Sequence, residues 1–346
     1  MFSKNVKCFL AIAIITLSGI SFAASTREID EVRKKTTFTN DDLAVIDSFI
    51  NEIFKEMLEA PTIEDSVKRR EDILVRKPKE GKSKYKEQFL ESVERNIVSS
   101  MKIVETWSDE TFIKAMKLNL AVMIGSLDDP KMSELAIEMM DSENIAVKYW
   151  ATKALTGTDV IESIKASPDS QLSESIFDTL KAEAQVNSPI NLEMIASFAG
   201  QFSNGSASEI LSAVAQTRIA AYKNNEAIHE SSDAAILKVM AEKIASDESK
   251  DTLAQPFANL TAQVFKKYAA GISPESGLGD ISSQQLITTI TEVEKNIFPK
   301  FNINAEFIKA IERRSEKDFQ QAYDKVFGSE DNEGELASNL GVSIEE

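Results

Sequence analysis

The side chains that could carry out catalysis in this chain are few. His229 is the only histidine and Cys8 the only cysteine among 346 residues. A tetrahedral zinc site needs several nitrogen or sulfur ligands, so the sequence excludes that class of metal site. A serine-hydrolase triad would have to use His229, yet no Gly-x-Ser-x-Gly nucleophile motif accompanies it. No glycine-rich phosphate or dinucleotide loop occurs either. We therefore expect no catalytic residue, no metal and no cofactor, and a capping or solvated role for His229.

Carboxylates are the one catalytic group present in excess. The chain has 56 Asp and Glu against 39 Lys and Arg, a formal net charge of −17. Two carboxylates suffice for glycoside hydrolysis, and helical toroids of similar length occur among enzymes of that class. Sugar sites also use aromatic platforms, whereas this chain offers only Trp107, Trp150 and five tyrosines. Because chance carboxylate pairs are inevitable in so acidic a sequence, a helical-toroid carbohydrate-active enzyme is retained only as the alternative function.

Positive charge concentrates in residues 68–86, which hold nine basic and three acidic side chains. The basic residues are Lys68, Arg69, Arg70, Arg76, Lys77, Lys79, Lys82, Lys84 and Lys86. One interpretation is a docking patch for an anionic partner, such as phospholipid head groups or an acidic surface. The other is a mobile, solvated loop around Pro78 and Gly81 that pairs with the protein's own acids; such exposed pairs contribute about 0–1 kcal/mol each. The acidity of the remaining chain argues against nucleic acid as a partner.

Residues 1–23 are predicted to be a signal peptide. Lys4 and Lys7 form a positive start, residues 8–20 an apolar core, and residues 21–23 place small side chains at the −3 and −1 positions. The apolar run is too short for a convincing membrane span. Cleavage removes Cys8, and with it any disulfide or thiol chemistry, and leaves 37 basic against 56 acidic side chains, a net charge of −19. We expect an exported protein, periplasmic or secreted, with no integral membrane segment after cleavage.

Beyond the signal peptide, apolar spacing predicts helix after helix and no strand. The 12 glycines and 8 prolines stand mostly between the apolar-periodic segments. We predict a flexible segment at 24–39, a helical-repeat domain at 40–270 and a Gly-rich linker at 271–281. C-terminal helices at 282–327 and an acidic disordered tail at 328–346 complete the chain.

Residues 128–157 carry the clearest structural pattern. Asp129 and Pro130 open a first helix as a cap and a first-turn proline, and Gly157 closes a second helix. Each helix has an apolar stripe at i, i+3, i+4, i+7 and i+8. The stripes are Met132, Leu135, Ala136, Met139 and Met140 in the first helix, and Val147, Trp150, Ala151, Ala154 and Leu155 in the second. A hairpin this small cannot bury both stripes alone, so neighbours of similar build are expected.

The segment from Met140 to Leu155 resembles a HEAT-type repeat, in which an Asp in the inter-helix turn precedes a Val-Arg pair, small residues and then Ala-Leu. The resemblance rests on Asp141, Val147, Lys148, Ala151 and the Ala154-Leu155 pair. It implies that Asp141 ties down the turn by accepting backbone N–H bonds, and that Lys148 lies where neighbouring repeats stack. Lysine in place of the usual arginine keeps the charge but loses the bidentate fork. Trp150 is interpreted as a buried stacking residue.

These patterns predict an all-α fold of antiparallel helix hairpins, stacked as an irregular HEAT-like α-solenoid, with an irregular helical bundle as the alternative. The expected function is an exported, non-enzymatic scaffold for protein–protein interaction, with an unidentified protein partner. Docking on an anionic surface through residues 68–86 is a weaker possibility.

Overall fold

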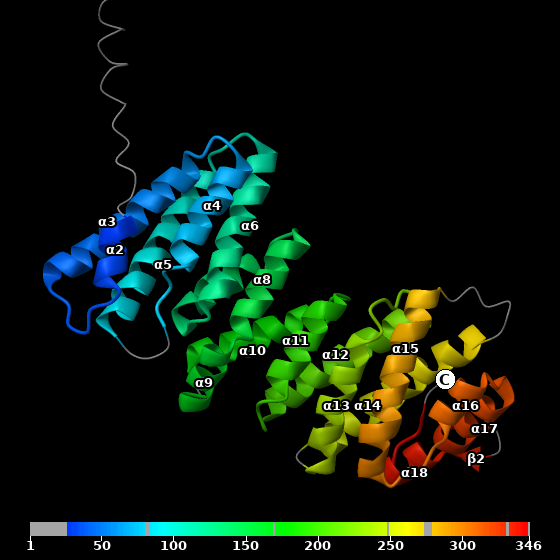
Figure 1. Cartoon of the computed structure of the whole chain (residues 1–346). Coiled ribbons are helices and arrows are strands. Elements are labelled where there is room, and N and C mark those ends of the chain that lie inside the picture. Colours follow the sequence, from blue (N-terminus) through cyan, green and yellow to red (C-terminus); the bar gives the residue numbers. More distant parts are fainter. Residues whose placement is uncertain are drawn as a thin grey trace, which may run out of the picture. The chain divides into compact units, whose positions relative to one another are not determined.

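The computed structural model describes residues 26–79, 83–168, 170–247, 249–272, 279–329 and 332–344. The predicted signal peptide and most of the predicted linker lie outside these residues. The all-α prediction is confirmed: apart from one pair of two-residue strands, the regular structure described is helical (Figure 1). The chain divides into two compact units, unit 1 ending at Leu127 and unit 2 beginning at Asp128.

Unit 1 consists of two stacked helix hairpins preceded by a short helix. Its elements are α2 (Thr26–Val32), α3 (Asn40–Leu58), α4 (Ile63–Leu74), α5 (Lys84–Val104) and α6 (Glu110–Leu127). Helix α3 packs on α5 and α4 packs on α6, so the two hairpins lie in register as two layers. The helix starts are locally encoded, since Thr39, Thr62 and Ser83 each accept a backbone N–H bond as N-caps.

Two sequence predictions for unit 1 are wrong. Residues 24–39 are not wholly flexible, because α2 buries Ile29 and Val32 against α3. Residues 68–86 are not a loop throughout, because Lys68 to Leu74 belong to α4, which the high charge of IEDSVKRREDIL concealed. A single buried face, here Ser66 and Ile73, is enough to dock such a helix once neighbouring hairpins supply the other side.

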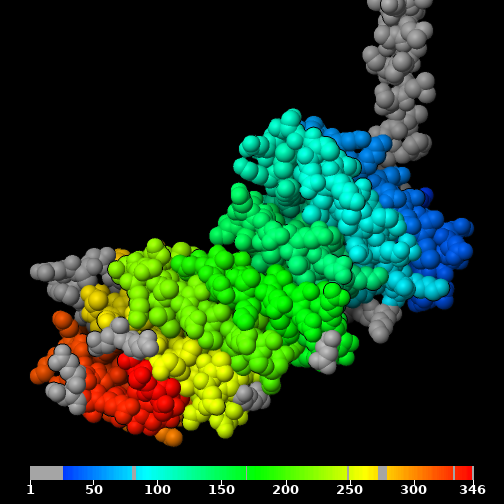
Figure 2. Space-filling view, turned by 180° about the vertical axis from the view of Figure 1, so that it is seen from behind, coloured from blue at the N-terminus to red at the C-terminus, as the bar shows by residue number. Residues whose placement is uncertain are grey.

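Unit 2 is a series of four helix hairpins arranged in two layers. The first helices are α7 (Ser133–Met139), α10 (Gln171–Glu183), α12 (Gly205–Lys223) and α14 (Lys250–Ile272). The second helices are α8 (Ile145–Leu155), α11 (Pro189–Ala199), α13 (Ser232–Ala245) and α15 (Asp280–Glu292). Each first helix contacts the next first helix and each second helix the next second helix, while α9 (Thr158–Ala166) is inserted after the first hairpin. The hairpins follow one another in chain order through the unit (Figures 1 and 2).

The hairpin at 128–157 has the predicted form, with a short 3₁₀ turn, η1 (Pro130–Met132), leading into α7. Asp129 caps that turn, and every predicted stripe residue except Trp150 is buried. Trp150 is instead partly exposed, with the Lys153 Nζ 4.4 Å from its ring centroid, so its prediction as a buried residue is wrong. It stacks edge-on with Tyr149 on the outer side of α8.

The turn of this hairpin is also held differently from the HEAT expectation. Asp141 is exposed, and among the described residues its side chain accepts no hydrogen bond. Asn144 takes the capping role, since its Oδ1 accepts the Ala146 N–H at 2.9 Å, and Ser142 Oγ accepts the Asn144 N–H at 3.2 Å. Asn144 therefore caps this turn in place of the Asp141 carboxylate that the HEAT resemblance implied.

The C-terminal part closes the end of unit 2. It contains a π-helical turn η2 (Val293–Ile297), a 3₁₀ turn η3 (Phe298–Phe301), α16 (Phe307–Arg313), α17 (Glu316–Phe327) and α18 (Glu335–Leu340). Strands β1 (Gly328–Ser329) and β2 (Asn332–Glu333) pair antiparallel between α17 and α18. Aromatic rings fill its core, with the Phe265 and Phe307 centroids 4.6 Å apart. The predicted disordered tail is wrong for residues 332–344, because α18 buries Leu336 and Leu340.

Candidate functional site

The hairpin connections of unit 2 form one continuous edge, which we call the turn edge: residues 140–145, 184–190, 224–231 and 279–282. Polar contacts join its parts step by step. Lys148, in the first turns of α8, lies 3.5 Å from the Glu183 carboxylate at the end of α10. Thr217 Oγ1 of α12 donates to the Ala184 carbonyl at 2.7 Å. Because these contacts link the end of one hairpin to the next, the connections share one side of the stack.

The same linkage continues to the last hairpin. Lys267 of α14 donates from Nζ to the Ala227 carbonyl at 2.8 Å and to the Glu230 carboxylate at 2.6 Å. Ser282, in the first turn of α15, also donates to the Glu230 carboxylate. Figure 1 shows α15 beginning on the upper side of unit 2, where the connection between α12 and α13 also lies.

An aliphatic side chain stands exposed at every step of the turn edge. Ile145 is the first residue of α8 and is 67 % exposed. Ile190 is the second residue of α11 and is 49 % exposed, and Ile281 is the second residue of α15 and is 75 % exposed. Ile228, in the connection before α13, is 57 % exposed. We call these four side chains the isoleucine row. Single exposed aliphatics are ordinary, but one isoleucine at or just before the start of each of four successive second helices is a pattern that folding alone does not require.

The isoleucine row has acidic surroundings. Asp141, Glu143, Glu226 and Asp280 are exposed on the turn edge, and Lys223, the last residue of α12, is an exposed lysine directly before it. Lys148 is paired with Glu183 and so adds no net charge there. The edge therefore combines apolar side chains with a net negative potential, in keeping with the charge of the whole chain.

A buried ion pair lies directly beneath the connection at 224–231. Arg218 of α12 donates from Nε and Nη2 to the Asp233 carboxylate of α13 at 2.7 and 2.8 Å, and both side chains are fully buried. The Arg218 Nη2 also donates to the Ile228 carbonyl at 3.1 Å. The Tyr222 hydroxyl donates to Asp233 at 2.5 Å, and burial, followed by the Asp233 charge, raises the pKa of Tyr222 well above its ordinary value. The pair thus holds the backbone that carries Ile228.

A second charged group holds the other side of this connection. Glu230 is buried, its N–H donates to Gln285 Oε1 at 3.1 Å, and its carbonyl accepts from the Thr289 hydroxyl at 2.8 Å. Burial would raise the pKa of Glu230, but the hydrogen bonds from Lys267 and Ser282 outweigh burial and lower it. Its carboxylate is accordingly charged and paired at neutral pH.

The backbone of the connection adopts a left-handed conformation at two non-glycine residues. Asn225 has φ 57° and His229 has φ 51°. Such residues persist where surrounding contacts fix them, as the Arg218 and Lys267 side chains do here. His229 is exposed, as predicted for a solvated residue, and its carbonyl accepts the Ser232 N–H at 3.0 Å.

The basic residues predicted as a patch are not gathered on one surface. Lys68, Arg69 and Arg70 pair with acids of α3 and α4, and Arg76 is buried against Asp30 and the Phe49 ring. Lys77 donates to the Ser126 carbonyl at 3.0 Å, Lys84 and Lys86 lie at the start of α5, and Lys82 lies outside the described residues. Four of the nine basic residues, Lys68, Arg69, Arg70 and Arg76, thus have acidic partners within the protein.

One basic cleft remains in unit 1. A cavity of about 720 Å³ is lined by Arg33, Lys34, Lys35 and Lys79, with Phe38 and Tyr85 as its aromatic walls. Only Lys79 comes from the predicted patch. Lys34 pairs with Glu31 and Lys35 with Asp42, while Arg33 donates to the Val75 and Lys77 carbonyls. Its cations are thus largely engaged by the protein itself.

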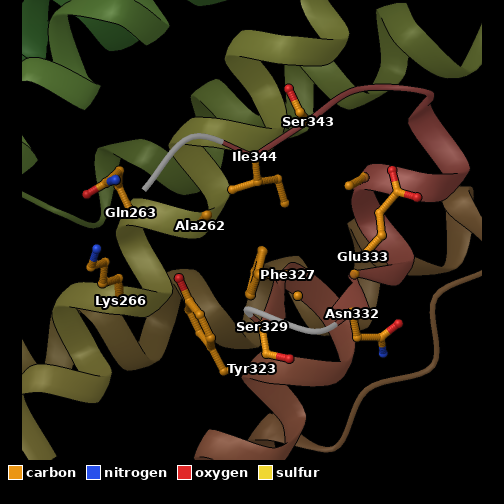
Figure 3. A pocket seen from close by; sticks show the side chains of 13 residues that line it. Ala262, Gln263, Lys266, Tyr323, Phe327, Ser329, Asn332, Glu333, Ser343 and Ile344 are labelled. Atoms are coloured by element: carbon orange, nitrogen blue, oxygen red, sulfur yellow. The ribbon is translucent and has the colours of Figure 1, made fainter.

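A further cavity of about 530 Å³ lies in the C-terminal part, between α14, α17 and the final residues (Figure 3). Tyr323 and Phe327 of α17 face Gln263 and Lys266 of α14, and Ile344 covers one side. Within the part of the lining that the structure describes, Glu333 is the one carboxylate.

Across the described ranges, no cluster of His, Cys, Asp and Glu could hold a metal ion. In the same part of the chain, no helix is long and apolar enough to cross a membrane.

The sequence missed the isoleucine row because its members are separated by irregular intervals. A usable signal does exist: Ile145 directly follows the N-cap Asn144, and Ile190 and Ile281 directly follow the first helical residues, Pro189 and Asp280. An isoleucine at such a position has no role in the apolar stripe of its own helix.

Comparison with known proteins leaves this geometry as the main basis for interpretation. No protein-family model and no curated protein matches the chain. A crystal structure titled as an engineered protein, from the Northeast Structural Genomics Consortium, aligns with 96 % of this chain and 96 % of its own at 14 % identity. Its TM-score is 0.22, so this likeness carries no argument about fold or function.

Proposed function

We propose that this chain is an exported, non-enzymatic scaffold of HEAT-like helix hairpins that binds another protein through the turn edge of unit 2. The observation that carries the proposal is the isoleucine row, with one exposed isoleucine at each of four successive hairpins. Export rests on the signal peptide predicted at residues 1–23, which would deliver the protein to the periplasm or the exterior.

The row is a reasonable size for such a site. Fully burying an exposed isoleucine side chain contributes about 1.5–3 kcal/mol. Because these four side chains are only 49–75 % exposed, covering the part that remains exposed contributes roughly 4–7 kcal/mol before any cost. Association costs about 4–15 kcal/mol in lost translational, rotational and side-chain freedom. The isoleucines alone therefore offset only the lower part of this cost, and complementary charge around them must add affinity, specificity and encounter rate.

The alternative of a carbohydrate-active enzyme receives less support from the same geometry. Glycoside hydrolysis uses two carboxylates on either side of the scissile bond. Among the described residues, the C-terminal cavity, the basic cleft and a third cavity of about 350 Å³ beside α12 each have a single carboxylate in their lining: Glu333, Asp30 and Glu226. The described lining of these three cavities therefore offers no such pair.

Site-specific photo-crosslinking in the producing cell tests the proposal. A photoreactive residue at position 228 or 281 should give a discrete crosslinked product, which Ile190→Asp in the same chain should reduce. Val75 of unit 1 is 60 % exposed and provides the matched position away from the turn edge, where we expect no such product. Equal products at positions 75, 228 and 281, or none at the two turn-edge positions, would count against the proposal.

A further inference from the structure

We infer that the partner bound at the turn edge is a positively charged amphipathic helix that places an apolar side chain at about every seventh residue. This inference rests on the proposed function and names the partner's chemistry. It is carried by the regular placement of the isoleucine row, by the acidic residues beside it, and by the rigid support under its centre.

The spacing of the row favours a helix. The second helices pack side by side in the order α8, α11, α13 and α15. Because packed helices lie roughly 8–10 Å apart, we expect neighbouring members of the row to be separated by about that distance. An α-helix advances about 1.5 Å per residue, so seven residues advance about 10.5 Å and return nearly to the same face. A helix of about 20 residues therefore reaches the whole row.

An extended strand fits this spacing poorly. Three strand residues cover about 10 Å, but side chains alternate between faces, so every third residue would point alternately toward and away from the row. A polyproline helix does return to one face every three residues, at about 9.3 Å. Its recognition grooves are lined with aromatic rings, whereas this row is aliphatic.

The charge of the edge sets the charge of the partner. The four exposed acids, Asp141, Glu143, Glu226 and Asp280, lie along the row, and Lys223 is an exposed lysine directly before the 224–231 connection. A partner helix with lysine or arginine beside its apolar stripe would be attracted, and an acidic helix would be repelled. The charge of −17 over the full chain adds to the same preference at long range.

The centre of the row is held rigid, which suits a preformed binding surface. The Arg218–Asp233 and Lys267–Glu230 pairs fix the backbone carbonyls of Ile228 and Ala227. Ile228 therefore keeps its place between Ile190 and Ile281 without the partner. A rigid surface reduces the ordering cost of binding.

Labelled synthetic peptides added to the mature protein test this inference by fluorescence anisotropy. The first peptide has about 22 residues, with leucine at every seventh position and lysine, alanine and glutamine elsewhere. The second has the same composition in scrambled order, and the third carries two central prolines that prevent a helix. We expect the first to bind at least about tenfold more tightly than either of the others, and to become helical by circular dichroism on binding.

Protein variants then locate the binding. Ile228→Asp/Ile281→Asp should weaken the first peptide at least about tenfold, Val75→Asp should not, and circular dichroism should show all variants folded because these side chains are exposed. Equal binding of the scrambled peptide would overturn the inference by showing charge attraction alone, and equal binding of the proline peptide would show an extended partner. If the peptides fail while crosslinks at positions 228 and 281 persist, the helical partner is wrong but the proposed function stands.

Discussion

The strongest stability prediction concerns the buried pair beneath the turn edge. Arg218 and Asp233 are both fully buried, and two N–H donors of Arg218 lie 2.7 and 2.8 Å from the Asp233 carboxylate. The substitution Arg218→Met leaves Asp233 buried with the Tyr222 hydroxyl as its remaining side-chain donor. Removing one partner of such a pair costs about 3–5 kcal/mol, out of a total stability that is usually about 5–15 kcal/mol.

Urea unfolding of the mature protein at neutral pH, followed by far-UV circular dichroism, measures this loss. For a unit of this size, it corresponds to a fall in melting temperature of about 6–20 °C. Lys181→Met is the matched control, because Lys181 pairs with Glu209 on the surface of the same unit at 2.6 Å, and its midpoint should hardly change.

A second variant separates the charge from the volume. The triple substitution Arg218→Met/Tyr222→Phe/Asp233→Leu removes the charges and the hydroxyl together, so no side chain of this cluster is left with an unpaired polar group. The Ile228 carbonyl loses the Arg218 donor in the single and the triple variant alike. Apolar replacement of a buried pair is often neutral or stabilising, and we expect the triple variant to recover most of the loss. If Arg218→Met costs less than about 1 kcal/mol, or the triple variant costs more than the single one, the reasoning about an uncompensated buried charge is refuted.

Three further predictions concern the pH response and the backbone of unit 2. The pKa of Glu230 is lowered from its ordinary 4.5, so the ionised Glu230 stabilises the folded state above that value, and this contribution is lost as pH falls through the folded pKa. Melting temperatures between about pH 6 and pH 3 should therefore fall more steeply in the wild type than in Glu230→Gln. Asn225 has a left-handed φ of 57°, which strains a β-branched residue but not glycine. Urea unfolding should therefore show Asn225→Val less stable by about 1–2 kcal/mol and Asn225→Gly unchanged or slightly more stable. Equal midpoints for the two variants would contradict backbone strain at this position. In Gly157→Ala the new Cβ would lie 2.0 Å from Asp128 Oδ1, so we expect the free energy of unfolding to fall by about 1–3 kcal/mol in the same assay. Adding Asp128→Gly should restore it, because glycine removes the clashing side chain and tolerates the φ of 49° at that position. If the double variant is no more stable than Gly157→Ala, the clash with Asp128 is not the cause.

The parts of the fold that could be predicted are those encoded locally. Apolar spacing gave the stripes of the hairpin at 128–157, and Asp129 with Pro130 marked its start, because a helix face and a cap both depend on residues within one or two turns. The same spacing misled at Trp150, which completes the stripe in sequence but lies at its border, where Lys153 rather than a neighbouring helix covers the ring. Periodicity places a residue on a face without measuring how much of that face a neighbour covers.

The parts that could not be predicted depend on contacts between distant segments. The steps of the isoleucine row are 45, 38 and 53 residues long, so no fixed sequence period reveals it. In the C-terminal part, the prediction of disorder followed the acidic composition. It overlooked Leu336 and Leu340, whose spacing places both on one face of a helix. They are buried only because α14 and α17 lie beside α18, which composition does not show.

The buried charges beneath the turn edge connect its stability to the proposed function. A buried ion pair is commonly no more stabilising than apolar side chains of the same volume. Yet the buried Arg218–Asp233 pair and the partly buried Lys267–Glu230 pair meet at the 224–231 connection. Each also binds a backbone carbonyl there, that of Ile228 or Ala227, so together they hold an irregular connection in one conformation. Packing of the core does not require an irregular connection to keep a single conformation. A binding surface that includes Ile228 benefits from it, because a preorganised surface loses less entropy on binding.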